Sequence, residues 1–387
     1  MTATGAQIPA LGVEEEYLLV AQDTGAVMPG GTSVLRRAAP VLGDLVSGEL
    51  TEYQIEAKTP PCTSLPALTR HLARMRAAVA AAAAAEGLRA VATGTPVLGA
   101  QDPVPLCGGA YNQRGAETYR GLNDTYALCA LHIHVDVPTR DDAVLVGNHL
   151  RPWLPTLVAL AANSPFWCER DSGYASWRTI SAGTWPVSGP PPYFTSGDHY
   201  RTLTAELCET GAADSEHRLY WAMRPSTHLP TLEIRAMDVS ASIDEVVTLA
   251  ALVRALVVVA LPRVRGGDPG PPLGEALLRA AYWRSARDGL TGQGFDPLSR
   301  RLVPATRLVE QLLEHVRPVL ADFGDLPQVT SVLHRLSAHG GGAERQRAVY
   351  ARRSRLHDVV DQLVRDTARV PGSPPAPVTA PQRPAAR

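Results

Sequence analysis

The sequence predicts a mixed fold of helices and strands built around a substantial core. Segments with helical apolar periodicity alternate irregularly with short β-type segments along the 387 residues. Four of the β-type segments place polar side chains on one face and apolar side chains on the other, as expected for an antiparallel sheet with one face on the core. Hydrophobic residues make up 45% of the chain, which excludes global disorder. The length suits one large domain or two ordinary ones.

Five helices are expected from apolar periodicity and from capping and breaking residues. Their predicted ranges are 63–86, 139–163, 242–261, 300–323 and 344–369. Pro152 and Pro155 should kink or split the second helix. Ser242 and Glu245 have the spacing of a capping box at the start of the third. Residues 183–197 are rich in Gly and Pro and predict a long loop of the kind that often serves function.

The four β-type segments span residues 12–20, 50–57, 131–137 and 231–238. Alternate side chains of a strand share a face. The polar side chains that share a face are Glu14 and Glu16 on the first segment, Glu52, Gln54 and Glu56 on the second, His132, His134 and Asp136 on the third, and Glu233 and Arg235 on the fourth.

These polar faces have an unusual composition. A single polar face has a plain explanation, because an antiparallel sheet often exposes one side to water. The first three faces, however, hold only Glu, Gln, His and Asp, and neighbouring like charges repel. Cations among the carboxylates would make such crowding stable. Oxygen ligands with an imidazole suit Mg²⁺ or Mn²⁺ rather than structural zinc, and Mg²⁺ often completes its coordination with substrate phosphates.

The basic residues restrict how a phosphate could be bound. Lys58 is the only lysine, and the other basic residues are arginines. A lysine-containing phosphate loop is absent, so ATP would have to bind through metals and arginines such as Arg235. The net charge of −1 disfavours a nucleic-acid partner.

The compartment expected from the sequence is the cytoplasm. The five cysteines are scattered and form no C-x-x-C pattern, which fits a reducing environment. No signal peptide is visible at the start of the chain. The most apolar segment, 246–261, is shorter than a membrane span and contains Arg254, so we interpret it as a buried helix and expect no membrane partner.

An ordered set of short motifs resembles the bacterial carboxylate-amine ligases of the type 2 glutamate–cysteine ligase family. The matching segments are GVEEE (12–16), TEYQIE (51–56), GTP (94–96), HIHV (132–135), SGPP (188–191), WAMRPS (221–226) and TLEIR (231–235) with Asp238. Each motif is weak alone, whereas their order over residues 11–366 is specific. The resemblance implies an α+β, glutamine-synthetase-like fold, in which an antiparallel sheet curves into a half-funnel with helices on its convex side.

The resemblance also implies a reaction and a set of site residues. ATP would phosphorylate the γ-carboxylate of glutamate, and the amine of a second substrate, normally cysteine, would then attack the acyl phosphate. The implied metal ligands, for Mg²⁺ or else Mn²⁺, are Glu14, Glu16, Glu49, Glu56, His132 and Glu233. Arg235 would face the transferred phosphoryl group, and His134, Arg178 and Arg224 would face the amino-acid substrate or the phosphates.

Two departures from the family pattern leave alternatives open. The family often has an acid at the position of Ala222 and a glycine at that of Asp136. The same chemistry on a different acid and amine, or a non-catalytic protein that binds ATP or a metabolite, therefore remain alternatives, and a homo-oligomer is possible. We expect one catalytic domain over residues 11–369, with disordered ends at 1–10 and at the Pro/Ala-rich segment 370–387.

Overall fold

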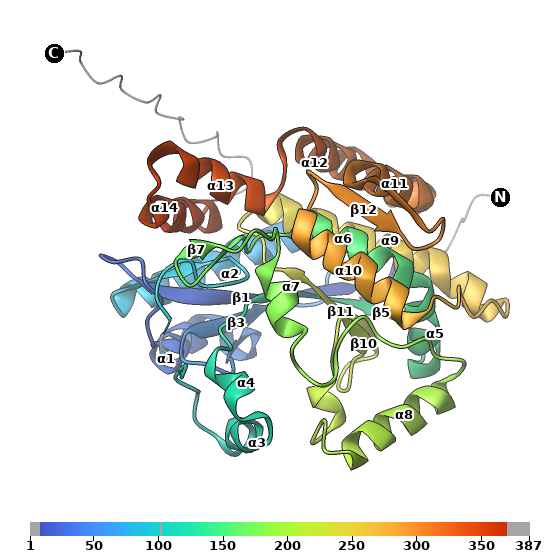
Figure 1. Ribbon diagram of the computed structural model, residues 1–387, viewed down its shortest axis with the longest axis horizontal. Helices are drawn as coiled ribbons and strands as arrows, with labels where there is room; N and C mark the ends of the chain where they lie inside the picture. Colours follow the sequence, from blue (N-terminus) through green and yellow to red (C-terminus); the bar gives the residue numbers. More distant parts are fainter. Residues whose placement is uncertain (1–7, 101–102, 370–387) are drawn as a thin grey trace.

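The computed structural model describes residues 8–100 and 103–369, and it has the α+β architecture predicted from the sequence (Figure 1). Within these residues the main sheet has seven strands, and all of their pairings are antiparallel. The order is β10-β11-β5-β1-β3-β2, with β4 also paired to β1. The strands are β1 (Leu11–Ala21), β2 (Val46–Gly48), β3 (Gln54–Lys58), β4 (Leu88–Val91), β5 (Ala130–Asp136), β10 (Met223–Pro225) and β11 (Thr231–Asp238).

The helices in chain order are α1 (Gly31–Leu42), α2 (Leu65–Ala85), α3 (Ala110–Tyr119), α4 (Gly121–Asp124), α5 (Arg140–Leu150), α6 (Leu154–Ala161), α7 (Trp177–Ala182), α8 (Gly197–Glu209), α9 (Ile243–Arg265), α10 (Glu275–Asp288), α11 (Ala305–Asp322), α12 (Leu326–His339), α13 (Gly342–Arg353) and α14 (Leu356–Thr367). Short 3₁₀ turns occur at Gly43–Leu45, Arg151–Trp153 and Glu216–Arg218. The remaining short strands form the pairs β6 (Phe166–Trp167) with β7 (Arg170–Asp171), β8 (Ser188–Gly189) with β9 (Tyr220–Trp221), and β12 (Gln293–Asp296) with β13 (Arg301–Pro304).

The apolar face of the sheet forms the main core with the helices on its convex side. Val13, Ile133 and Ile234 are buried and belong to one hydrophobic cluster with residues of α9, including Val246 and Val253. In Figure 1 the helices α9 to α12 lie on this side of the sheet, whereas α3, α4 and α8 flank the other side. Because side chains alternate along a strand, burying this face turns the acidic residues toward the opposite, concave face.

Helix α9 is long and apolar enough to cross a membrane by length and composition. In its most apolar window, however, 78% of the residues are buried inside the protein. It packs against α5, α11 and α12 as well as the sheet. The segment is therefore the central helix of the core, in agreement with its interpretation from the sequence.

Several predicted elements differ in their bounds. The helix expected over 139–163 is split into α5 and α6 around Pro152, as predicted. The helix expected over 344–369 is wrong as a single element, because Ser354 adopts a left-handed backbone (φ 52°) between α13 and α14. The helix expected from residue 300 starts at Ala305, since the preceding residues form β13.

The predicted disordered ends fall mostly on residues 1–7 and 370–387, which lie outside the described residues. Ala10, the last residue of the predicted segment 1–10, is described, and its backbone carbonyl accepts a hydrogen bond from the backbone N–H of Asp136 (3.0 Å). This contact continues the pairing of β1 with β5 by one residue.

Candidate active site on the concave face

The strand register places the predicted site residues side by side. Glu14 on β1 lies opposite His132 on β5 and Lys58 on β3. Two residues further along β1, Glu16 lies opposite Glu56 on β3. Because opposite residues of antiparallel strands bring their side chains within contact distance, the three strands β1, β3 and β5 contribute to one polar surface.

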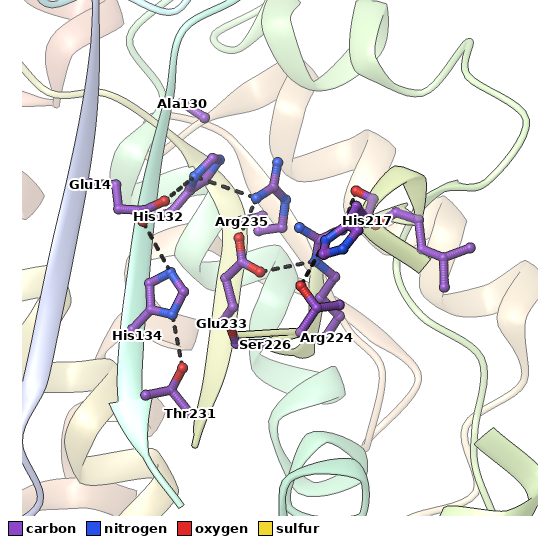
Figure 2. A network of polar contacts seen from close by, with 12 residues as sticks. Glu14, Ala130, His132, His134, His217, Arg224, Ser226, Thr231, Glu233 and Arg235 are labelled. Atoms are coloured by element: carbon purple, nitrogen blue, oxygen red, sulfur yellow. Dashed lines mark hydrogen bonds and ion pairs between the residues drawn. The ribbon is translucent and has the colours of Figure 1, made fainter. Parts of the chain in front are cut away.

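Glu14 lies at the centre of this surface, between two imidazoles (Figure 2). One of its carboxylate oxygens is 3.1 Å from Nδ1 of His132, and the other is 3.6 Å from Nε2 of His134. Burial alone would raise the pKa of Glu14, but its interactions with the two imidazoles of His132 and His134 outweigh burial and hold the pKa well below its usual value. Glu14 is therefore a carboxylate at neutral pH.

Glu233 is held between two arginines at the other side of β5. Its carboxylate accepts a hydrogen bond from Nε of Arg224 (2.9 Å) and a short one from Arg235 (Figure 2). Burial favours the neutral acid, but the charges of Arg235 and Arg224 dominate and lower the pKa of Glu233. A register shift in β11 between Ile234 and Met237 gives Arg235 its place at a bulge, a local feature that often re-aims a side chain at a functional site.

A second concentration of acid lies along β1 and β3. Carboxylate oxygens of Glu16, Glu49 and Glu56 lie within 4.8 Å of one another. Glu16 accepts a hydrogen bond from the backbone N–H of Ala130 (2.7 Å), and Glu56 accepts one from the hydroxyl of Ser47 (2.8 Å). Glu49 reaches the group from the connection between β2 and β3.

In this second group, burial and the neighbouring carboxylates outweigh the positive charges nearby. Burial raises the pKa of Glu16 to about 7, although Arg178 and Arg235 act in the opposite direction. Burial and the neighbouring carboxylates likewise raise the pKa of Glu49 and Glu56. Buried acids with raised pKa values that share a small volume are what a bound divalent cation would stabilise.

Among the described residues, three sets of side chains have the ligand atoms and the spacing to hold a metal ion. They are Glu14 with His134 and Glu233, Glu14 with Glu56 and His132, and Glu16 with Glu49 and Glu56. These sets contain all six of the metal ligands expected from the family resemblance, together with His134. Carboxylates dominate each set, which suits Mg²⁺ or Mn²⁺.

His134 carries a specific sign of a ligand role. Its Nε2 atom is buried and has no hydrogen-bond partner among the described residues, yet it points toward Glu14 (Figure 2). Its Nδ1 atom is 2.9 Å from the hydroxyl of Thr231. An imidazole that is fixed through one nitrogen, while the other faces a carboxylate without a hydrogen bond, has the arrangement of a metal-ligating histidine. The family resemblance implies that His134 faces the amino-acid substrate or the phosphates, and that role stays a prediction.

The two other expected arginines are occupied by protein groups. Besides Glu233, the guanidinium of Arg224 donates to the backbone carbonyls of His217 (2.7 Å) and Leu219 (2.9 Å). Arg178, on α7, donates to the backbone carbonyl of Arg235 (3.1 Å). Arg224 therefore holds the side chain of Glu233 in place, and Arg178 holds the backbone of β11 at Arg235.

Glu52 does not share the polar face of its neighbours, so that part of the prediction is wrong. The strand begins only at Gln54, and Glu52 lies in a turn before it. There its carboxylate accepts a hydrogen bond from the backbone N–H of Thr32 (2.9 Å) at the start of α1. An acid at this end of a helix compensates the unpaired N–H groups, which explains its presence without any catalytic role.

Two residues of the site were missed by sequence reasoning. Thr231 belongs to a recognised motif, but nothing in its residue type indicates that it contacts His134. Lys58 is the last residue of β3, and its ammonium is 2.7 Å from Glu56 and 3.9 Å from Glu14. Strand alternation continued for one residue beyond the predicted end of the segment would have placed Lys58 on the polar face.

The residues that depart from the family pattern adjoin the site: the backbone carbonyl of Ala222 accepts a hydrogen bond from the N–H of Arg235 (2.7 Å), and Asp136 lies opposite Thr231. Ala222 is 5% exposed and packs in the hydrophobic cluster of the convex side. Asp136 is exposed at the end of β5. Neither residue belongs to one of the three ligand sets found among the described residues.

Comparisons with solved structures identify the fold. A bifunctional glutathione synthetase from Pasteurella multocida superposes with a TM-score of 0.68 at 15% identity over 93% of this chain, which spans about half (52%) of that protein. A glutamate–cysteine ligase from Francisella tularensis, solved in complex with AMP, gives a TM-score of 0.67 at 12% identity over 94% of this chain and 89% of that one. These matches confirm the predicted fold, a glutamine-synthetase-like curved sheet with helices on its convex side.

Comparisons of sequence identify the family. A protein of Saccharopolyspora erythraea with the provisional name glutamate–cysteine ligase 2-1 is 43% identical over 92% of this chain and 94% of its own length. One from a Mycobacterium species (strain KMS), provisionally named glutamate–cysteine ligase 2-2, is 41% identical over 93% of this chain and 98% of its own length. The model of glutamate–cysteine ligase family 2 matches residues 10–366. The chain therefore belongs to glutamate–cysteine ligase family 2, a family of carboxylate–amine ligases.

Proposed function

We propose that this protein is an ATP- and Mg²⁺-dependent ligase that joins the γ-carboxylate of glutamate to an amine, with cysteine as the default amine. The observation that carries this proposal is the convergence of the three ligand sets on one concave surface beside Arg235. A surface that needed only to face water would have no use for so many buried acids. The proposed compartment is the cytoplasm.

The donor set fits divalent metal ions that bind ATP phosphates. The residues that would hold them are the members of the three sets: Glu14, Glu16, Glu49, Glu56, His132, His134 and Glu233. When bound, Mg²⁺ supplies charge neutralisation for the phosphates and for the leaving ADP. Burial and the charge of Arg235 lower the pKa of His132, which keeps its imidazole neutral and able to act as a ligand.

Arg235 is the cation best placed to stabilise the transferred phosphoryl group. Its guanidinium contacts Glu233 and lies 3.5 Å from Nδ1 of His132, so it projects over the ligand sets. Its side chain is 20% exposed, which leaves it accessible from the concave side. Arg224 and Arg178, which are bound to protein groups, would act as positioning residues for Glu233 and for the bulge that carries Arg235.

The proposed chemistry has two steps. An oxygen of the glutamate γ-carboxylate attacks the γ-phosphorus of ATP, the bond to the β–γ bridging oxygen breaks, and ADP leaves. The neutral amine then attacks the acyl carbon of the γ-glutamyl phosphate, the carbon–oxygen bond to phosphate breaks, and the amine gives up one proton as the amide forms. Arg235 would lower the barrier of the first step by stabilising charge on the equatorial phosphoryl oxygens.

The direct test is a screen of acid and amine pairs with Mg-ATP, followed by mass spectrometry. We expect γ-glutamylcysteine, ADP and phosphate in equal amounts, and ADP formation only when both the acid and the amine are present. A screen that yields neither an amide nor ADP from any pair would contradict the ligase assignment.

A pair of variants tests the role of the acidic surface. Glu16→Gln keeps the size of the side chain but removes its charge, and we expect it to abolish metal-dependent binding of ATP measured by calorimetry. Glu52→Gln is the matched control, because Glu52 belongs to another of the family motifs but contacts α1. Equal ATP binding by the Glu16→Gln variant and the unmodified protein would remove Glu16 from the proposed ligands.

The identity of the amine is the part of the proposal with an open alternative. The same chemistry on another acid or amine remains a candidate because Ala222 and Asp136 depart from the family pattern. A steady-state comparison of glutamate and cysteine with other pairs separates the two. High kcat/KM with cysteine would exclude the alternative, whereas tight ATP binding without turnover of any pair would favour a non-catalytic protein.

A further inference from the structure

The only lysine of the chain lies inside the proposed metal-binding surface. Lys58 is opposite Glu14 across the β1–β3 pair and follows Glu56 at two residues on the same strand. Its Nζ atom is 2.7 Å from a carboxylate oxygen of Glu56 and 3.9 Å from one of Glu14. Apart from the histidines, every other basic residue of the chain is an arginine, so the residue type at this position is distinctive.

The two carboxylates that Lys58 contacts identify one ligand set. Glu14 and Glu56 occur together only in the set that also contains His132. The other two sets each contain just one of these carboxylates, and each has two further ligands that make no ion pair with Lys58. Lys58 therefore stands at the central set and leaves most of the ligands of the flanking sets untouched.

An ammonium and a divalent ion cannot share this position. A metal ion bound to the same oxygens would lie about 2.1 Å from them, and hence only a few ångströms from an ammonium that contacts those oxygens. Repulsion at that distance is strong in a partly buried site.

The side chain of Lys58 also has a route away from the site. It is 37% exposed and lies at the end of β3, so its flexible stem can rotate toward solvent. If each flanking set holds one ion, a third ion could enter the central set only when the ammonium leaves Glu14 and Glu56. Binding of that ion would then be weaker than binding at the flanking sets.

We propose that Lys58 is a built-in cation at the central ligand set, so that the protein binds two divalent ions readily and a third only in competition with its own ammonium. The proposal rests on the metal-binding role given to this surface under the proposed function. Lys58 would then control how many metal ions bind. Its ammonium would also make the charge of the metal-free site less negative than the carboxylates alone would.

The test is a count of bound Mn²⁺ per chain on the full-length protein without nucleotide, by equilibrium dialysis with detection of free Mn²⁺ by electron paramagnetic resonance. We expect two ions for the unmodified protein at concentrations at which the Lys58→Met variant binds three. The last ion should bind at least tenfold more tightly to Lys58→Met. Lys58→Arg, which restores a positive charge, should return the count to two.

A control variant on another element separates the explanations. Arg307→Gln also removes a cation from an acidic partner, Glu310 (2.9 Å), but on helix α11 of the convex side. It should leave the count at two, which excludes an effect of net charge alone. Equal counts for the unmodified protein and Lys58→Met, or a third ion in Lys58→Arg as well, would overturn the proposal. Absence of Mn²⁺ binding to the unmodified protein would instead overturn the proposed function and this inference with it.

Discussion

At the scale of single residues, one hydroxyl fixes the orientation of His134. Thr231 is buried, and its Oγ1 is the hydrogen-bond partner of Nδ1. We predict that Thr231→Val, which removes the hydroxyl at nearly constant volume, weakens Mn²⁺ binding by about 10- to 100-fold, because groups that orient a ligand contribute that much to metal affinity. Isothermal titration calorimetry measures the change. Thr231→Ser keeps the hydroxyl and should bind almost normally, so equal losses in both variants would contradict this role.

The site residues that could be predicted from sequence are those whose type and spacing carry the chemistry. Alternation along a strand is enough to put Glu14 with Glu16 and His132 with His134 on one face. It does not tell which atoms of neighbouring strands meet, because register depends on tertiary pairing. The contact of Thr231 with His134 and the bridge from Lys58 to Glu14 are both products of register, and so they could not be predicted.

At the scale of elements, a buried ion pair ties β1 to α2 and to the start of α9. Arg76 on α2 makes a bidentate contact with Glu15, and it donates to the backbone carbonyls of Ser240 and Ala241 (both 2.7 Å). We predict that Arg76→Met lowers the free energy of unfolding by about 3–5 kcal/mol, because it leaves the Glu15 carboxylate buried without its partner. Urea unfolding measures the loss.

The double variant Glu15→Leu/Arg76→Met provides the control for this prediction. Replacing both charges removes the desolvated carboxylate, so the double variant should be more stable than Arg76→Met alone. If the double variant were less stable than the single one, the loss would have to come from packing or from the two carbonyls rather than from the unpaired charge.

A second polar contact joins the first turn of α9 to α13 and should make stability depend on pH. Arg345 donates two hydrogen bonds to Glu245 (2.7 and 2.8 Å), and the hydroxyl of Ser240 donates a third. Burial would raise the pKa of Glu245, but Arg345 and Ser240 lower it overall. A depressed pKa in the folded state means that this contribution is complete above the unfolded value, about 4.5, and is lost as the pH falls through the folded value.

The variant that reports this dependence is Glu245→Gln. We predict a loss of about 1–3 kcal/mol at pH 7, toward the lower end because Arg345 is partly exposed, and a smaller loss as the pH is lowered from 5 to 3. Urea unfolding of both proteins at each pH gives the difference. A difference that stays constant or grows on acidification would contradict the assigned role of the carboxylate.

The same contact shows why element ends were predicted less well than the elements themselves. Ser242 and Glu245 have capping-box spacing, yet Ser242 makes no side-chain capping bond, so that prediction is wrong. The Glu245 carboxylate is bound to α13 instead, from a hundred residues away in the sequence. Glu52 is a second case. Its alternation with Gln54 and Glu56 predicts a strand, but its hydrogen bond to Thr32 at the start of α1 holds it in a turn. In each case a tertiary partner outweighs the local pattern.

At the scale of the whole molecule, folding and function make opposite demands on the same sheet. The apolar face packs on α9 and stabilises the fold, while the other face gathers carboxylates whose raised pKa values at Glu16, Glu49 and Glu56 reflect burial and mutual repulsion. A near-zero net charge hides this separation. The metal-free protein should therefore be less stable than the metal-bound one, with the whole difference arising on one face.

This argument gives a prediction for the melting temperature. A ligand at 100 times its Kd stabilises the folded state by about 2.7 kcal/mol per site, which for a protein of this size corresponds to a rise in Tm of a few degrees. We predict such a rise with MnCl₂ and its reversal by chelation, measured by differential scanning fluorimetry. NaCl at equal ionic strength should give a smaller change, because general screening acts weakly on buried charges. Glu14→Gln, which removes a carboxylate shared by two ligand sets, should lose most of the rise, whereas Glu52→Gln should keep it. A Tm that responds equally to MnCl₂ in both variants would locate the bound metal away from the concave face.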